Sequence, residues 1–303
     1  MNRNTKKKNG VAYTTYGIVV IFIFFAIWSI SSLPSNFPVG TNFVVDEGES
    51  LQSISARLET EHYINSALFF RMWVSFLGRD RHVQLGLYSF DEPLTLGSVV
   101  KRLIYGNPDA PLLSITVPEG STTGETAEII KKVLPDFSID VFNKKVSEKD
   151  ANGKLFPSTY YLLPSYDEEK IVSMMMDTFN RKYEAYFAKS KIPTQLKNQQ
   201  EVIILASLLE GEAKTEEDMK LVSGILLKRL SINMALQVDV AKETYKSRGL
   251  PNEPINNPGI IALDATFNPT SSSYLYYLTD KTGIMHYSKT FEEHKRNIQK
   301  YLK

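Results

Sequence analysis

The stretch from residue 200 to residue 212 holds two carboxylates at the end of an apolar run, Gln-Glu-Val-Ile-Ile-Leu-Ala-Ser-Leu-Leu-Glu-Gly-Glu. This pattern predicts a buried helix that is too short to span a membrane, with Glu210 where the helix reaches a surface or cleft. Desolvation there raises the pKa of a carboxyl group and makes it a proton donor near neutral pH. Spacing alone favours the opposite interpretation, in which Glu210 and Glu212 mark the exposed end of a core helix, because perturbed acids are a minority.

A second polar pair follows at Gln237 and Asp239. In an extended segment the two side chains would share one face, where an amide beside a carboxylate suits the hydroxyl and acetamido groups of sugars. The same pair is equally natural in any loop. Sugars also stack on aromatic rings, although a chain with 16 tyrosines contains a cluster of them by chance. The tyrosines near this pair and near the C-terminus are Tyr245, Tyr274, Tyr276, Tyr277 and Tyr287.

Other reactive residue types give no second centre. His286 and His294 are eight residues apart without a third ligand of clear spacing, so a structural role is favoured and no metal site is predicted. The chain has no cysteine, which excludes disulfides, thiolate zinc sites and a cysteine nucleophile. It also lacks the GxSxG, P-loop and GxGxxG motifs, and no cofactor is expected.

Helices and short strands must position these residues. A strand from residue 43 leads into a turn, and Ser50 is expected to cap a helix that has Leu51, Ile54 and Leu58 on one face. Helices are also predicted at 64–77, 96–104, 171–187, 199–209 and 222–230, with strands at 85–90 and from 113. A hairpin is predicted from strands 274–278 and 285–288 around Asp280-Lys-Thr-Gly283. The predicted fold class is α+β.

The N-terminus predicts a membrane anchor. Residues 13–33 are almost entirely apolar and long enough to span a bilayer, and basic residues within 1–12 orient this tail toward the cytoplasm. Residues 34–42 form a tether. A cleaved signal peptide is the alternative, but no convincing small-x-small triplet follows the apolar core. The expected location is the bacterial cytoplasmic membrane, single-pass, with the catalytic region outside.

Charge excludes a nucleic-acid-binding protein. The net charge of +1 includes four basic residues in the N-terminal tail, and without them the chain has 31 basic and 34 acidic residues. A surface that binds phosphates gives a domain a basic excess instead. We therefore expect no nucleic-acid partner.

The region outside the membrane divides into two predicted parts. Residues 43–108 begin with a strand, turn and amphipathic helix that resemble the first half of a LysM module, a small polysaccharide-binding fold. Plain scaffold is the more frequent explanation of such a unit. A loop at Asp109-Ala-Pro111 marks the boundary, and residues 109–303 form the second part.

Short motifs follow one another through the second part. They are Thr116-Val-Pro-Glu-Gly-Ser-Thr122, Gly153-Lys-Leu-Phe-Pro-Ser-Thr-Tyr160, Leu205-Ala-Ser-Leu-Leu-Glu-Gly-Glu212, Met234-Ala-Leu-Gln-Val-Asp239, Gly249-Leu-Pro251, Pro254-Ile-Asn-Asn-Pro-Gly259, Asn268-Pro269, Tyr274-Leu-Tyr-Tyr277, His286-Tyr-Ser288 and Glu293-His294. Each motif is weak by itself. As an ordered set they resemble the endolytic murein transglycosylases, the YceG-like family, over nearly everything beyond the anchor.

The resemblance implies a lytic transglycosylase with a mixed α/β catalytic domain. Such an enzyme cleaves the β-1,4 bond between N-acetylmuramic acid and N-acetylglucosamine in nascent peptidoglycan, leaves 1,6-anhydro ends and so terminates glycan elongation. It makes Glu210 the catalytic acid, which reverses the interpretation from spacing. The implied substrate-binding residues are Glu212, Gln237, Asp239, Tyr245, Asn257, Tyr276 and His286. The implied partners are peptidoglycan strands, the cytoplasmic membrane and, by family inference, peptidoglycan synthases.

The chain departs from the family pattern. Asn152 stands where relatives commonly carry an acidic residue, Val240 stands where proline is expected, and the usual insert before Gly249-Leu-Pro251 is missing. In relatives that insert helps to wall the glycan cleft, and Tyr245 is the candidate to replace its final tyrosine. Two alternatives stay open. One is a muramidase that hydrolyses the same bond with water, and the other is a non-catalytic peptidoglycan-binding or divisome scaffold, which the missing insert favours.

Overall fold

The computed structural model describes residues 31–302 apart from 47, 80–82, 107 and 110–111, and it divides into two compact units between Leu113 and Ser114. The predicted tail at 1–12 and nearly all of the predicted anchor at 13–33 lie outside the described residues. In the part of the chain that is described, no helix is both long and apolar enough to cross a membrane. Both units combine helices with two-stranded sheets, which confirms the predicted α+β class.

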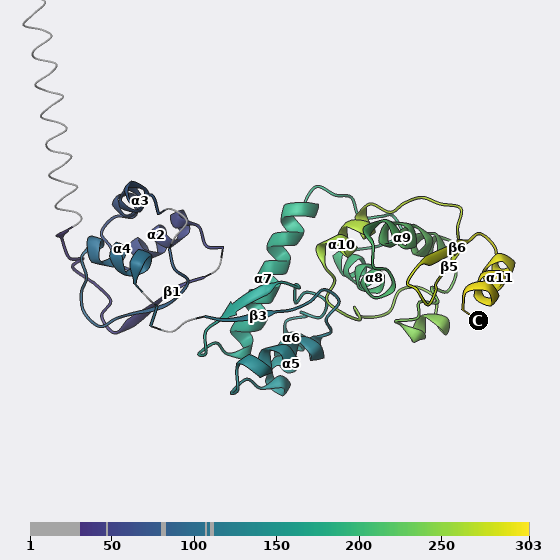
Figure 1. Ribbon diagram of the computed structural model, residues 1–303, viewed down its shortest axis with the longest axis horizontal. Helices are drawn as coiled ribbons and strands as arrows, with labels where there is room; N and C mark the ends of the chain where they lie inside the picture. Colours follow the sequence, from purple (N-terminus) through teal and green to yellow (C-terminus); the bar gives the residue numbers. More distant parts are fainter. Residues whose placement is uncertain (1–30, 47, 80–82, 107, 110–111, 303) are drawn as a thin grey trace, which may run out of the picture. The chain divides into compact units, whose positions relative to one another are not determined.

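The first unit has the order β1 (Thr41–Val45), α2 (Leu51–Thr60), α3 (Ala67–Phe76), β2 (Gly86–Phe90) and α4 (Leu96–Tyr105), as Figure 1 shows. The two strands pair antiparallel, with Thr41 opposite Phe90. Alternate strand residues, among them Phe43 and Tyr88, are buried against the helices, as the two-residue period of a strand requires. The predicted cap is confirmed, because the Ser53 N–H donates to the Ser50 hydroxyl (3.1 Å).

The second unit begins within β3 (Leu113–Thr116), which pairs with β4 (Thr159–Leu162). Between these strands lie α5 (Thr123–Val133) and α6 (Ile139–Glu148), and α7 (Glu168–Phe187) follows β4. Helix α6 packs against both α5 and α7. Thr122 and Glu125 form a reciprocal capping box at the start of α5, so the turn after β3 has a fixed geometry.

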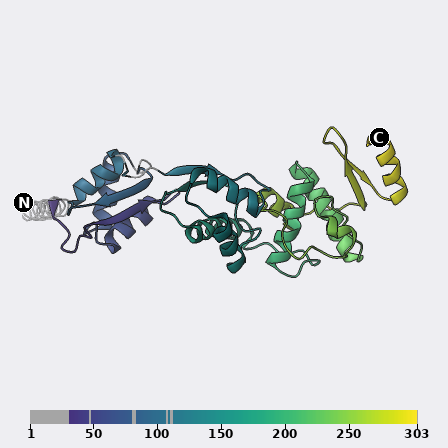
Figure 2. The ribbon, with the colours of Figure 1, turned by 90° about the horizontal axis from the view of Figure 1, so that it is seen from below.

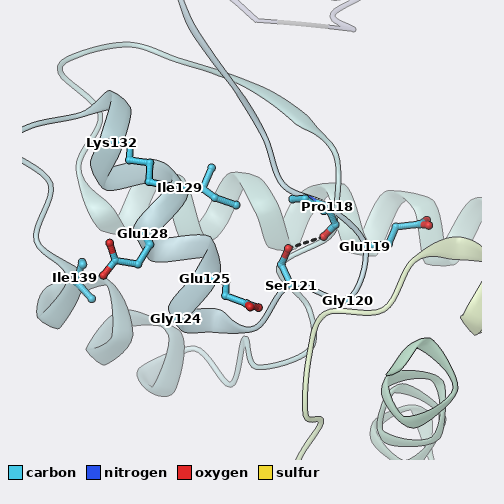
Figure 3. Close-up of a pocket in the computed structure, with 10 residues that line it drawn as sticks. All are labelled: Pro118, Glu119, Gly120, Ser121, Gly124, Glu125, Glu128, Ile129, Lys132 and Ile139. Atoms are coloured by element: carbon cyan, nitrogen blue, oxygen red, sulfur yellow. Dashed lines mark hydrogen bonds between the residues drawn. The ribbon is translucent and has the colours of Figure 1, made fainter. Parts of the chain in front are cut away.

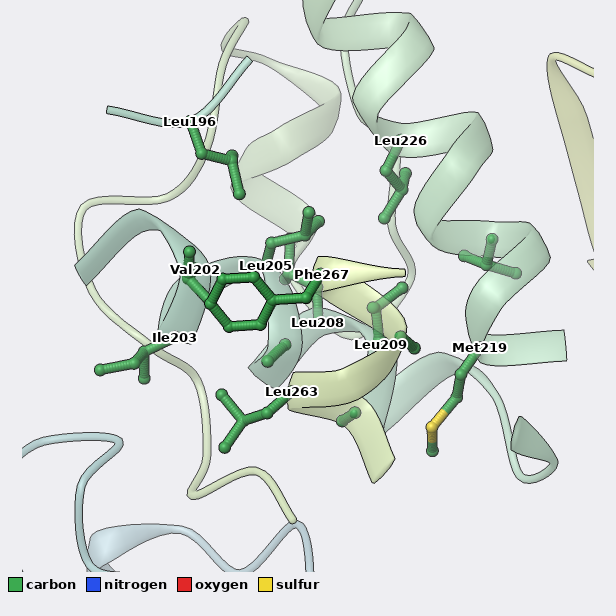
Figure 4. Close-up of a cluster of buried hydrophobic side chains, with 14 of the residues drawn as sticks. Leu196, Val202, Ile203, Leu205, Leu208, Leu209, Met219, Leu226, Leu263 and Phe267 are labelled. Atoms are coloured by element: carbon green, nitrogen blue, oxygen red, sulfur yellow. The ribbon is translucent and has the colours of Figure 1, made fainter. Parts of the chain in front are cut away.

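The core of the second unit surrounds α8 (Gln199–Glu212). Helices α9 (Glu216–Ser231) and α10 (Ile260–Phe267) pack on α8, and Figure 4 shows the apolar side chains that fill the space between them. Every residue from Val202 to Leu209 is buried. A helix this apolar needs neighbours on all sides, and α9, α10 and the loops beside them supply those neighbours.

The C-terminal part contains the short 3-10 helix η1 (Lys242–Tyr245), the strands β5 (Tyr276–Thr279) and β6 (Met285–Ser288), and α11 (Phe291–Tyr301). Strands β5 and β6 form the predicted antiparallel hairpin, in which Tyr276 faces Ser288 and Thr279 faces Met285. Helix α11 packs on both strands, and Figure 2 shows the three elements together at the C-terminal end.

Candidate active site

Helix α8 carries Glu210 to the edge of the core, where its side chain is partly exposed. Burial raises the pKa of the Glu210 carboxyl, a hydrogen bond from the Gly259 N–H to Oε2 (2.8 Å) lowers it, and the negative charge of Glu119 raises it. The net direction is upward, because loss of water around the charged form outweighs the one hydrogen bond. Glu210 therefore keeps a proton at a pH at which an exposed glutamate has lost it.

The loop before α10 is fastened to α8 one turn before Glu210. The Ser207 hydroxyl accepts a hydrogen bond from the Ile255 N–H (3.1 Å), and the Ser207 carbonyl accepts one from Asn256 Nδ2 (3.0 Å). Residues three apart lie on the same side of a helix, so these bonds hold the loop over the side of α8 that carries Glu210. They help to keep the Gly259 N–H aimed at the carboxyl.

Asn257 joins three segments behind the acid. Its side chain is 1% exposed; Oδ1 accepts a hydrogen bond from the Leu155 N–H (3.0 Å), and Nδ2 donates to the Ser121 carbonyl (2.9 Å). The Asn257 N–H donates to the same carbonyl, and the Asn257 carbonyl accepts from the Gly120 N–H (3.1 Å). We predicted a substrate contact for Asn257, but both amide atoms serve the backbone, as buried polar groups usually do. These bonds hold the loops together, and the substrate contact of Asn257 stays a prediction.

The segment that starts at Gly153 packs against the same loop. Gly153 has φ +76°, and a Cβ there would lie 2.6 Å from Pro254 Cγ, so both its backbone angle and the contact require glycine. Next to it, Asn152 Nδ2 donates to the Glu253 carboxylate (3.0 Å). An acidic side chain at 152 would face that carboxylate, so the departure from the family pattern suits a partner present in this chain.

A cavity of about 390 Å³, here called the tyrosine pocket, lies beside the last residue of α8. It brings together five of the predicted substrate-binding residues with others that were not predicted for this role. The predicted lining residues are Glu212, Gln237, Asp239, Tyr245 and Tyr276, and the others include Arg229, Tyr277 and His294. Aromatic rings beside amide and carboxylate groups are a suitable lining for a sugar.

Glu212 is the acid of the tyrosine pocket. Burial is the largest cause that raises its pKa, the nearby Asp239 charge adds to it, and the hydrogen bond from the Val240 N–H to Oε1 (3.1 Å) opposes it. The Tyr277 hydroxyl lies near enough to lower the pKa of Glu212, but it is buried and no described atom completes a hydrogen bond with it. A buried hydroxyl without a partner is available to a ligand.

The segment that carries Gln237 and Asp239 is a turn rather than an extended strand, so of the two conformations considered from the sequence the loop is the one observed. Gln237 has φ +48°, and Val238 bridges to Ala241 three residues later. The Thr244 hydroxyl stabilises the turn by accepting the Val238 N–H (2.9 Å) and donating to the Ala241 carbonyl (2.6 Å). Gln237 and Asp239 nevertheless line one pocket, for a reason other than strand alternation.

The short bridge after this turn replaces the missing insert. It returns Tyr245 to the pocket, where the Tyr245 hydroxyl donates to Asp239 Oδ1 (2.6 Å). Burial and that carboxylate raise the pKa of Tyr245 to about 12, so it stays a hydrogen-bond donor. Val240, which stands where proline is expected, supplies the N–H that binds Glu212, and a proline has no such donor.

Arg229 and the histidines complete this region. Arg229 is buried, its guanidinium donates to the Leu275 and Leu236 carbonyls, and its Cζ lies 5.3 Å from the Tyr276 ring centroid. His294 stacks on Tyr276 inside the pocket. His286 lies outside the pocket lining; its Nε2 is 2.8 Å from Asp280 Oδ2, and its ring stacks on Tyr301. The substrate contact of His286 stays a prediction.

A larger cavity of about 680 Å³, here called the α5 pocket, has Glu119 in its lining. Figure 3 shows Glu119 at one end of it and Glu128 with Lys132 at the other. Gly120 lies in its wall, and a Cβ on Gly120 would be 3.3 Å from Glu210 Cγ. Glu119 was not predicted as a site residue. A signal was present in its Val-Pro-Glu-Gly motif, which ends in a glycine that has φ +75°, a backbone angle that favours glycine.

Of the two acids at the end of α8, Glu212 lines the tyrosine pocket, and Glu210 lies against Gly120, which is in the wall of the α5 pocket. Among the described residues no group of three or more histidine, aspartate or glutamate side chains is arranged to hold a metal ion. The groups that do converge are acids, amides and aromatic rings. They suit proton transfer and the binding of a neutral polyhydroxyl ligand.

This chain is similar to known proteins over most of its length. The profile of the YceG-like family matches residues 43–242 and 243–300. An endolytic murein transglycosylase of Bacillus subtilis strain 168 is 26% identical over 309 residues, which cover 86% of this chain and 84% of the relative. One from Streptococcus pneumoniae strain D39 is 25% identical over 85% of this chain, and the chain spans 58% of that relative's length.

A solved yceG-like protein of Listeria monocytogenes has the same fold, with a TM-score of 0.54, 23% identity and coverage of 84% of this chain and 98% of that one. The family match includes the β1–α4 unit, the acid at the end of α8 and the tyrosine pocket. The chain belongs to the YceG-like family.

Proposed function

We propose that this protein is a peptidoglycan lytic transglycosylase in which Glu210 is the catalytic acid. The observation that carries the proposal is the environment of that carboxyl, half-buried at the end of an apolar helix with its pKa raised by burial. The names of its relatives from Bacillus subtilis and Streptococcus pneumoniae support the same class of enzyme. The proposed bond is the β-1,4 link between N-acetylmuramic acid and N-acetylglucosamine.

One carboxyl can perform both proton transfers. Because the Gly259 N–H donates to Oε2, the proton of the acid form belongs on Oε1. Glu210 gives this proton to the glycosidic oxygen as the bond to C1 breaks, and N-acetylglucosamine leaves with a new hydroxyl. The C6 hydroxyl of the muramic acid then attacks C1 and returns its proton to Glu210. The product is a 1,6-anhydro ring, and neither water nor a covalent enzyme intermediate is required.

The tyrosine pocket is proposed as a sugar subsite. Gln237, Asp239 and Glu212 offer donors and acceptors for hydroxyl and acetamido groups, and Tyr245 and Tyr276 offer rings for stacking. The pocket lies beside the helix end that carries Glu210, so one glycan chain could occupy it and pass the acid. Peptidoglycan synthases are proposed partners from the resemblance alone.

The first unit is proposed to bind or position glycan as a LysM-like module of residues 43–108, followed by the catalytic domain of 109–303. Its support is the order of a strand, two helices and a second strand, with the strands paired antiparallel and the helices packed on them. The proposed anchor at 13–33, with the tail inside and the tether at 34–42 outside, would confine cleavage to new strands near the cytoplasmic membrane.

The test is Glu210→Gln in the full-length protein, with Glu217→Gln on the exposed start of α9 as the matched control. Loss of a general acid should lower the rate of anhydro-muropeptide release by at least about a hundredfold, while the control keeps full activity. Release at the wild-type rate by Glu210→Gln would refute the assignment.

A muramidase is the second candidate, because Glu119 brings another carboxylate close to Glu210 and hydrolases use two. The mass of the product distinguishes the two, since a hydrolysed end is heavier by one water than an anhydro end. A scaffold without activity would instead bind strands equally well with or without Glu210 and would release neither product.

A further inference from the structure

Two carboxylates meet at one glycine. The Gly259 N–H donates to Glu210 Oε2, and Glu119 Oε1 packs so closely on the other side of Gly259 that a Cβ there would lie 2.0 Å from it. Glycine is thus the residue that lets both acids approach. Gly259 also precedes α10, which makes it the first donor at the positive end of that helix.

The backbone fixes this arrangement. The segment of Glu119 is paired with the segment of Gly259 through Gly120 N–H to the Asn257 carbonyl (3.1 Å) and Asn257 N–H to the Ser121 carbonyl (2.9 Å). Gly120 lies against the Glu210 side chain itself. Glu119 is therefore held at Glu210 by its main chain, although its own side chain is exposed.

The other charged groups nearby face elsewhere. Glu125 is engaged in the capping box with Thr122, and Glu128 and Lys132 lie at the far end of the α5 pocket (Figure 3). Glu212, on the same helix as Glu210, accepts its hydrogen bond from Val240 on another side. Within the described residues Glu119 forms no ion pair, so no cation there neutralises the charge it brings to Glu210.

We propose that Glu119 is a positioning residue, whose carboxylate at the shared glycine disfavours a second negative charge there and so keeps Glu210 in its acid form. The need is physical, because an N–H donor at a helix start favours ionised Glu210 and would remove the proton that the first step requires. Burial opposes that loss, and the Glu119 charge acts in the same direction as burial. The inference rests on the proposed function of Glu210.

The experiment compares the wild type with Glu119→Gln and Glu119→Ala, and uses Glu128→Gln as the control. Glu128 is exposed in the same pocket, so its substitution removes an equal charge far from Gly259. Two quantities are measured on the full-length protein: the pH dependence of anhydro-muropeptide release, and the titration of the Glu210 carboxyl by carbon NMR, assigned from its absence in Glu210→Gln.

Glu119→Gln and Glu119→Ala should titrate Glu210 at lower pH and move the alkaline limb of the rate profile in the same direction. Above that limb the rate should fall by about fivefold, the effect of one nearby unit charge through water, while the rate at acid pH is retained. Glu128→Gln should match the wild type in both measurements.

Two results would overturn the inference. One is an unchanged Glu210 titration in both Glu119 variants. The other is a folded Glu119 variant that is inactive at every pH, which would make Glu119 a catalytic base or nucleophile. Failure of the proposed function would look different, because the wild type would then release no anhydro product while the NMR comparison would still report on Glu119.

Discussion

Substitution of Asn257 by alanine separates a structural role from a substrate contact. The change removes the acceptor of the buried Leu155 N–H and the donor to the Ser121 carbonyl. Leaving one buried N–H without a partner costs about 1–3 kcal/mol, and loss of the second bond adds about 1 kcal/mol. The Ser121 carbonyl keeps the N–H of residue 257, so it adds no further penalty. We expect the free energy of unfolding to fall by about 2–4 kcal/mol.

The assay is urea unfolding monitored by two spectroscopic signals, tryptophan fluorescence and far-UV circular dichroism. The second unit contains neither of the two tryptophans, because Trp73 is on α3 and Trp28 lies outside the described residues. Tryptophan fluorescence therefore does not report on the unfolding of the second unit, whereas far-UV circular dichroism reports on its helices. Asn257→Ala should shift the circular dichroism transition to lower urea and leave the Trp73 transition in place.

The matched control is Asn252→Ala, an exposed asparagine of the same loop, which should unfold like the wild type. The reasoning also predicts that kcat falls in Asn257→Ala, because the bonds that align Gly259 and Glu119 with Glu210 are weakened. A variant with unchanged unfolding and a raised KM would refute it, since that pattern belongs to a residue that touches substrate.

Three further predictions concern packing, binding and pH. Gly224→Ala should destabilise the second unit in urea unfolding, because its Cβ would lie 2.1 Å from the Thr270 carbonyl oxygen. Overpacking costs about 1–3 kcal/mol and the gain in helix propensity is about 1 kcal/mol, so the net loss is up to about 2 kcal/mol. Gly124→Ala, with open space around it, should not destabilise. Tyr277→Phe should keep its thermal midpoint but raise the KM for glycan strands by about tenfold, the loss of one buried hydrogen bond to a ligand; an unchanged KM would contradict this. The folded-state pKa of Glu212 is raised, so its ionisation penalises the fold, and wild-type stability should fall as pH rises from about 4.5 through that raised value. In denaturation series at several pH values Glu212→Gln should show a smaller fall, the remainder coming from Glu210, whose pKa is raised too.

Elements with strong local signals could be predicted from the sequence. Ser50 before an amphipathic run predicted the cap of α2, the unbroken apolar stretch predicted the burial of α8, and Asp280-Lys-Thr-Gly283 predicted the β5–β6 hairpin. Each depends on residues within one turn or hairpin of one another. The environment of Glu210 followed in part from the same logic, because the end of a buried helix is where a carboxyl loses water without losing access to solvent.

The rest depends on contacts between distant segments. Ser121 and Asn257 are 136 residues apart, and no local pattern indicates that they meet or that they bring Glu119 to Glu210. The turn at Gln237 could not be predicted for a related reason. Alternation places Gln237 and Asp239 on one face of an extended segment, but it does not indicate a left-handed residue whose N–H donates to the Thr244 carbonyl. Asn257 had the residue type of a sugar ligand, yet burial assigned its amide to the backbone.

The separation of Glu210 from Glu212 follows from the geometry of α8. Two residues correspond to about 200° of rotation around a helix, so these acids cannot face the same way. Glu210 points to Gly259 and Glu119, whereas Glu212 points to Val240 and the tyrosine pocket. The same burial that makes the core stable raises the pKa of both acids, so one apolar helix carries the proposed proton donor on one side and the proposed binding acid on the other. Each acid also has a second carboxylate nearby that opposes its ionisation, Glu119 for Glu210 and Asp239 for Glu212. The two environments differ in the hydrogen-bond donor, since the N–H that binds Glu210 lies at the start of α10 and the N–H that binds Glu212 lies in the turn at Val240.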